Sequence, residues 1–291
     1  MSTIRVTEKL PVLPASPPPI FTLPTPRVNE KALLDLALRF KLEGEEQSGC
    51  IARDAATFTY SEGAFDLTLH RASGAFRFQD RHRWQVDHGA TVDLSDEDAT
   101  KLARAWLRRY KLLPEESQVL RVSRLHVAAA GPERKVEDHR IIDVAVCFQP
   151  VVQGVPVDGP GGKVTVYLDH EGKMTCVDYL RRRVGSVYRK VTGLRTPEQA
   201  IEEANRHWTK RGVNEVEVSE VRFCYFELGW NDVQTYLQPA YMILATLIGP
   251  DRRIKTGDIF VAPAAVNAVA PLVPLPRAPR PQKPREERQP R

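Results

Sequence analysis

The stretch that decides the fold is IIDVAVCFQPVVQGVPVDGPGGKVTVYLDHEGKMTCVDYLRRRV, residues 141–184. Its first half alternates apolar and polar residues and is rich in β-branched types, which is typical of strands. Residues 158–162 predict a turn, and residues 163–168 and 173–179 predict a hairpin. The turn between them ends at Gly172, which can adopt the positive φ that a tight hairpin turn requires. The stretch therefore predicts three or four antiparallel strands.

Three helices are expected, and each precedes a group of strand-like runs. Asn29 is a typical N-cap before an apolar stripe of helical period that runs to about residue 42. Ser95 with Asp98, and Thr196 with Gln199, have the spacing of capping boxes. Strands are expected after each helix, so the same order of elements occurs three times along the chain.

This order predicts an α+β fold of three repeated units. A helix with one apolar stripe and a sheet with one apolar face must cover each other. Each unit is then one helix on a curved antiparallel sheet. The expected units span residues 29–90, 95–187 and 196–265.

Proline-rich segments flank these units. Residues 1–28 form an arm whose prolines exclude helix and central strand. Two alternatives are open for it: a disordered leader, or docking of the apolar residues Ile20, Phe21 and Leu23. Residues 266–291 form a Pro/Arg-rich tail that we expect to be disordered.

The composition is that of an ordinary globular protein, with 42% hydrophobic and 27% charged residues. The tail from residue 277 has six basic and two acidic residues, so it carries most of the net charge of +5. The rest is nearly neutral, and nucleic-acid binding is therefore expected only through the basic tail. No apolar run is long enough to span a membrane. The N-terminus lacks a signal-peptide pattern, which predicts a cytoplasmic protein, or a secreted one if a leader is missing.

No metal site or cofactor is predicted. The four cysteines are widely spaced, which favours buried free thiols over a zinc site. Residues 159–163 resemble a phosphate loop only until Val164, where Ser or Thr would be needed, so a turn is expected. His82 and His88 allow a metal or catalytic pair, but a solvated loop is the simpler interpretation.

Four residues are candidates for binding. Arg181, Arg182 and Arg183 follow a strand, and guanidinium groups bind carboxylates or phosphates in a bidentate manner. The alternative is a surface cluster that pairs with nearby acids. Trp230 is expected at a hairpin tip, where an exposed indole would suit partner binding.

One phrase carries a resemblance to a known family. Its residues are Gln153, Gly154, Pro156, Val157, Gly159, Asp169 and Gly172, followed later by Leu237-Gln-Pro-Ala-Tyr-Met242. The phrase resembles the PepSY/FTP-like propeptide domains of thermolysin-family proteases, mainly over residues 95–265. The resemblance implies a helix-on-sheet module of cystatin-like architecture that acts as a chaperone, inhibitor or regulatory domain. The chain has no His-Glu-x-x-His, so no zinc-protease site accompanies it.

The leading hypothesis is a non-enzymatic module that binds a protein or peptide, by edge-strand pairing or in a groove. One alternative is a structural or assembly subunit that uses its proline-rich arms. Another is an enzyme with a pocket between helix and sheet. No catalytic motif is present, so catalytic residues stay unassigned and the enzyme hypothesis is the weaker one.

Overall fold

The computed structural model describes residues 2–44, 49–83, 90–130, 136–249 and 254–272. These ranges contain three helices: α1 (Glu30–Arg39), α2 (Asp96–Arg109) and α3 (Pro197–Lys210). No helix in them is both long and apolar enough to cross a bilayer.

The strands are β1 (Thr3–Val6), β2 (Ile20–Thr22), β3 (Cys50–Arg53), β4 (Thr57–Glu62), β5 (Phe65–His70), β6 (Phe76–Asp80), β7 (Ser117–Ala130), β8 (Val136–Val152), β9 (Val155–Asp158), β10 (Lys163–Leu168), β11 (Met174–Leu180), β12 (Val187–Arg189), β13 (Glu215–Phe226), β14 (Tyr236–Leu237), β15 (Pro239–Ile248) and β16 (Lys255–Pro263).

The helix starts follow from local hydrogen bonds, as the sequence predicts. Asn29 accepts a hydrogen bond from the backbone N–H of Ala32, and Ser95 caps α2 in the same way. Thr196 and Gln199 form the complete capping box of α3. These bonds satisfy donors that the first turn of a helix leaves free.

Thirteen strands form one large mixed sheet, in the order β16-β15-β13-β9-β8-β10-β11-β6-β5-β4-β3. β7 pairs with β8, and β1 pairs with β13. The short strand β9 joins the two halves because it lies antiparallel to β8 and parallel to β13. A second, three-stranded sheet has the order β12-β2-β14.

The prediction of an α+β fold built from repeated units is wrong. The described chain is mostly β, and its strand groups continue one sheet instead of closing three separate layers. β8 is 17 residues long, so its body pairs with β7 and β10 while its last two residues pair with β9. α1 and α2 share a single apolar core that includes Leu33, Leu107 and Phe148. A second core under α3 includes Trp208, Val218 and Ile243.

The resemblance to PepSY-type propeptide domains is wrong for the same reason. Its phrase does not mark a repeated helix-on-sheet unit. Gln153 and Gly154, with φ of 51° and 76°, make the turn from β8 to β9. Gly159 and Gly162 also have positive φ and lead from β9 to β10. Turn residues of this kind satisfy backbone geometry and do not specify a family.

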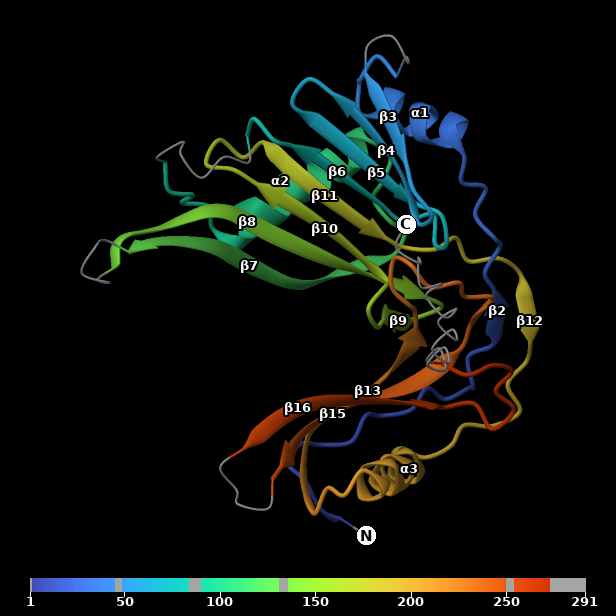
Figure 1. Cartoon of the computed structure of the whole chain (residues 1–291). Helices are drawn as coiled ribbons and strands as arrows, with labels where there is room; N and C mark the ends of the chain where they lie inside the picture. The colour runs from blue at the N-terminus through green and yellow to red at the C-terminus, as the bar shows by residue number, and fades with distance from the viewer. Residues whose placement is uncertain (1, 45–48, 84–89, 131–135, 250–253, 273–291) are drawn as a thin grey trace, which may run out of the picture.

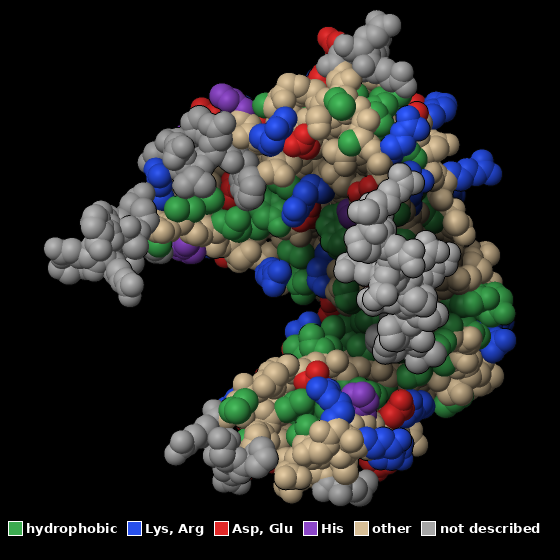
Figure 2. Space-filling model, viewed as in Figure 1, with side chains coloured by type: hydrophobic (Ala, Val, Ile, Leu, Met, Phe, Trp, Pro, Cys, Tyr) green, Lys and Arg blue, Asp and Glu red, His purple; other side chains and the backbone are tan. Residues whose placement is uncertain are grey.

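Figure 1 shows a strongly bent, two-lobed molecule. The first lobe holds α1, α2 and the strands β3–β8, β10 and β11, and the second lobe holds α3 with β1, β13, β15 and β16. α3 lies on the outer side of the second lobe, and β9 lies at the bend (Figure 1). Figure 2 shows that the surface is hollowed between the two lobes.

The N-terminal arm is packed against its own chain. β1 pairs with β13, starting at Thr3 opposite Glu215, and β2 pairs with β12 and β14. Ile20, Phe21 and Leu23 are all buried, which is the docked alternative of the two expected ones.

The start of the C-terminal tail is packed as well. The Gln238 side chain donates to the carbonyl of Ala270 and accepts from the N–H of Val269. Leu272 is buried against Phe226 and its neighbours. Residues 273–291 of the expected disordered tail lie outside the described residues.

Candidate functional site

The arginine cluster that the sequence singles out lines a cavity of about 940 Å³. The cavity lies between four segments that are distant in the sequence: residues 24–27, 73–74, 111–115 and 179–184. Figure 1 shows two of them as the connections from β2 to α1 and from β11 to β12. Loops held by a rigid scaffold in this way commonly carry binding sites.

The lining of this cavity, which we call the basic pocket, is strongly cationic. Arg27, Lys111, Arg181 and Arg183 contribute basic side chains, and Glu115 is the one acidic residue among the described lining. Within the described part of the chain, none of these four basic side chains forms an ion pair. The alternative of a cluster that pairs with nearby acids therefore does not describe Arg181 and Arg183, whereas Arg182 does have an acidic partner, Glu227.

Lys111 is placed by the end of α2. It has a left-handed φ of 55°, and its N–H donates to the carbonyl of Arg108. Leu112 then donates to the carbonyl of Leu107, which closes the helix end. The C-terminal end of a helix carries partial negative charge, which a nearby cation offsets. Lys111 therefore keeps this wall of the pocket positive.

Arg182 has a structural role that separates it from its two neighbours. Its side chain is only 6% exposed and forms an ion pair with buried Glu227 at 3.3 Å. It also donates to the carbonyls of Leu228 at 2.5 Å, Gly229 at 2.9 Å and Asp232 at 2.6 Å. These bonds fasten the chain at 181–183 to the loop 227–232, so they position Arg181 and Arg183.

Burial dominates the titration of this ion pair. Desolvation raises the pKa of Glu227 to about 7, although the Arg182 charge and hydrogen bonds lower it. Desolvation also lowers the pKa of Arg182, against the attraction of Glu227. Both shifts have the direction expected when two charges leave water together.

Trp230, the other predicted candidate, is used inside the molecule. It lies half-buried on the loop that Arg182 holds, and its ring is 4.6 Å from the ring of His70 between centroids. A hydrogen bond of 3.0 Å joins His70 Nδ1 to Asn231 Oδ1. This contact ties the loop to the end of β5, so Trp230 is not an open platform for a partner.

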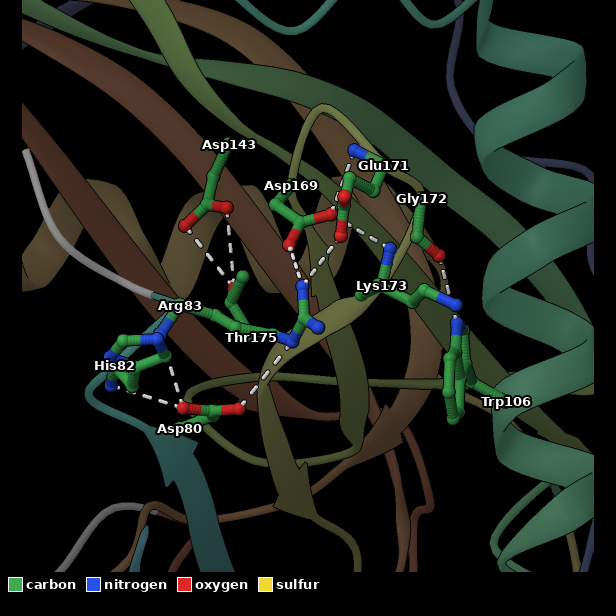
Figure 3. Close-up of polar contacts among 10 residues, drawn as sticks. All are labelled: Asp80, His82, Arg83, Trp106, Asp143, Asp169, Glu171, Gly172, Lys173 and Thr175. Atoms are coloured by element: carbon green, nitrogen blue, oxygen red, sulfur yellow. Dashed lines mark hydrogen bonds and ion pairs between the residues drawn. The ribbon is translucent and has the colours of Figure 1, made fainter. Parts of the chain in front are cut away.

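A second polar cluster locks the β10–β11 hairpin in place (Figure 3). Arg83 donates to Asp169 at 3.0 Å and to Glu171 at 2.9 Å, and Asp80 lies 3.7 Å away. Trp106 of α2 donates its indole N–H to the carbonyl of Gly172 at 3.0 Å. The carboxylates raise the pKa of Arg83, because each stabilises its charged form.

The described histidines near this hairpin belong to no group that could hold a metal ion. His82 and His170 line a cavity of about 270 Å³ together with residues of the Arg83 cluster. Across the described ranges, no group of three or more His, Cys, Asp or Glu side chains has the arrangement of a metal site. His88, its predicted partner, lies outside the described residues.

The cysteines are free, and three of them are buried: Cys147, Cys176 and Cys224. Burial raises the pKa of Cys176 to about 12 and that of Cys224 further still. These two thiols stay protonated at neutral pH, and a thiol is a much weaker nucleophile than a thiolate. The prediction of buried free thiols is confirmed for these three.

Sequence reasoning found part of the pocket and missed the rest. Arg181 and Arg183 could be predicted because they belong to a run of three consecutive arginines. Sequence reasoning missed Arg27 and Lys111, which are brought to the pocket by the docked arm and by the end of α2.

Comparison with known proteins gives a fold and no family. No protein-family model matches the chain, and no curated protein matches it. A crystal structure at 1.45 Å resolution of an uncharacterized protein from Eubacterium rectale ATCC 33656 is similar to it, with a TM-score of 0.52. The two are 10% identical, over 87% of this chain and 85% of that chain. This likeness shows a shared fold alone, and it supports no relation to the PepSY-type domains.

Proposed function

We propose that the protein is a non-enzymatic binding module that holds a segment of a protein or peptide partner in the basic pocket. The observation that carries this proposal is the cavity of about 940 Å³ with four basic side chains that have no ion-pair partner among the described residues. Guanidinium and ammonium groups stay charged at neutral pH and offer donors only, which suits the holding of an anionic group.

The character of the cavity supports a peptide over a compact apolar ligand. Small-molecule sites have volumes of roughly 300–1,000 Å³ and are lined mainly by apolar side chains. This cavity has a volume near the upper end of that range, and its surface is mainly polar. An extended peptide segment can form many weak polar contacts along such a lining.

Rigidity of the pocket walls also supports a binding role. Arg182 is fixed by the buried contacts described above, and Gly74 packs directly against the arm. A Cβ at Gly74 would lie 2.8 Å from the Cβ of Pro26, so the two walls meet closely there. Preorganised walls reduce the entropy that binding must overcome.

The two rival hypotheses have less support. Two stretches of the N-terminal arm, β1 and β2, pair with strands of the same chain, so these stretches are not free to join a neighbouring subunit. The described interfaces between the helices and the large sheet are filled by apolar side chains, as in a packed core. Nucleic-acid binding through the basic tail stays a prediction, because residues 273–291 lie outside the described ranges.

The proposal is tested by placing a photo-crosslinking amino acid at Thr25, an exposed residue of the pocket wall. The matched control places it at Glu202, an exposed position on α3 in the other lobe. In lysate of the source organism, Thr25 should give a discrete protein adduct that excess unlabelled protein suppresses. An absence of adducts, or the same adducts from Glu202, would contradict the proposal.

A further inference from the structure

We infer that the segment held by the basic pocket is acidic, with at least two carboxylates close together. This inference rests on the proposed function and names the chemistry of the partner. The described lining has five basic residues and one acidic residue, Glu115. Arg182 pairs with Glu227, and the other four have no ion-pair partner among the described residues: Arg27, Lys111, Arg181 and Arg183. A concave surface of one charge sign concentrates its field and attracts ligands of the opposite sign.

The contrast with other arginines of the chain strengthens this inference. Arg77 forms a bidentate pair with Asp178, with distances of 2.6 and 2.8 Å. Arg222 contacts both Glu220 and Asp158. These arginines on the sheet have internal carboxylate partners, whereas the pocket has four cations without one among the described residues. An external carboxylate group would supply the missing partner.

The anchoring of the cations suits carboxylates in particular. Arg181 and Arg183 lie on either side of Arg182, whose buried bonds fix the local backbone. A guanidinium group presents two parallel N–H donors that match the two oxygens of a carboxylate. Lys111 adds a compact charge from the end of α2. The two arginines of residues 181–183 and the lysine at the end of α2 can therefore bind more than one carboxylate at once.

The test measures binding of hexaglutamate to the full-length protein by titration calorimetry. Hexaglutamine is the neutral peptide control, and inorganic pyrophosphate is the non-peptide anion. The pocket variant is Arg181→Glu with Arg183→Glu. The matched control is Arg189→Glu with Lys190→Glu, which makes the same charge change at exposed positions outside the pocket. Circular dichroism and thermal unfolding check that both variants fold.

We expect hexaglutamate to bind, and its affinity to fall by about tenfold or more in the pocket variant, as for the loss of two charge-assisted contacts. The control variant should change the affinity by less than about threefold, because its charges are exposed to solvent and do not line the pocket. Equal losses in both variants would overturn the pocket as the site.

The peptide controls separate this inference from the proposed function. If hexaglutamine binds the pocket as well as hexaglutamate does, the acidic specificity is overturned while the binding module stands. If pyrophosphate binds and neither peptide does, both the acidic peptide and the proposed function are overturned. If none of the three probes binds, the inference is overturned, and the crosslinking at Thr25 decides the proposed function by itself.

Discussion

Replacement of Arg182 by methionine should destabilise the protein by about 3–5 kcal/mol, the usual effect of removing one partner of a buried ion pair. The substitution leaves Glu227, which is 2% exposed, without its counter-ion. It also removes the donor from three backbone carbonyls of the loop 227–232. Each lost hydrogen bond is worth about 1 kcal/mol, and the packing of the methionine side chain offsets part of the total.

The free energy of unfolding is measured by urea titration, followed by both tryptophan fluorescence and far-UV circular dichroism. Coincident transitions from the two probes show that a single free energy applies. Arg181→Met is the matched control, and we expect it to change stability by less than about 0.5 kcal/mol because no described side chain pairs with Arg181.

The double variant Arg182→Met with Glu227→Leu sharpens this test. Removal of both charges should recover part of the lost stability, because Glu227 is then no longer buried without a partner, although the three loop carbonyls still lack the Arg182 donor. The reasoning is refuted if Arg182→Met costs less than about 1 kcal/mol, or if the double variant is no more stable than the single one.

Three further outcomes are expected. Burial raises the pKa of Glu227 from 4.5 to about 7, so the folded protein binds the proton of the Glu227 carboxyl group more tightly than the unfolded chain does. The tighter proton binding contributes about 3 kcal/mol to the free energy of unfolding below pH 4.5, and this contribution is lost as the pH rises through 7. Urea titrations across this range should show that loss in the native protein and not in Glu227→Gln, and parallel pH profiles would refute it. Gly161→Ala would place a Cβ 2.2 Å from the backbone carbonyl oxygen of Leu228 and should lower the free energy of unfolding by about 2 kcal/mol or more. Gly257→Ala, which has open space around it, should change this free energy by less than about 0.5 kcal/mol. Equal effects of the two substitutions would contradict the predicted clash with Leu228. Trp106→Phe removes the hydrogen bond to the carbonyl of Gly172 and should lower the unfolding free energy by about 1 kcal/mol, and an unchanged urea midpoint would speak against this link between α2 and the hairpin.

The helices could be predicted because their signals are local. Asn29, Ser95 and Thr196 each cap a helix through a backbone N–H three residues away, so sequence spacing is sufficient. The hairpin turn at Gly172 is local in the same sense, and its φ of 70° is the expected one.

The topology could not be predicted because it depends on distant pairs. β1 lies against β13, with Thr3 opposite Glu215, and no local pattern specifies that contact. β9 has only four residues, yet it connects the two lobes by pairing with β8 on one side and β13 on the other. An apolar face on each strand group is compatible with three closed units or with one continued sheet, and the sequence pattern does not distinguish them.

In the candidate site too, local features could be predicted from the sequence, and contacts between distant residues could not. Three consecutive arginines mark a segment that lines the basic pocket, but the different roles of its members come from three-dimensional contacts. Arg182 is buried and pairs with Glu227, which is 45 residues away in the sequence, whereas Arg181 and Arg183 line the pocket without an ion-pair partner among the described residues. Arg27 joins them only because the arm docks on its own chain.

The most direct test of the central claim is to identify, by mass spectrometry, the partner peptide that becomes crosslinked to position 25. The account predicts one predominant partner segment in which aspartate and glutamate clearly outnumber lysine and arginine. The adduct should disappear when Arg181 and Arg183 are both replaced by glutamate. A neutral or basic segment, or an adduct that survives this charge reversal, would contradict the account.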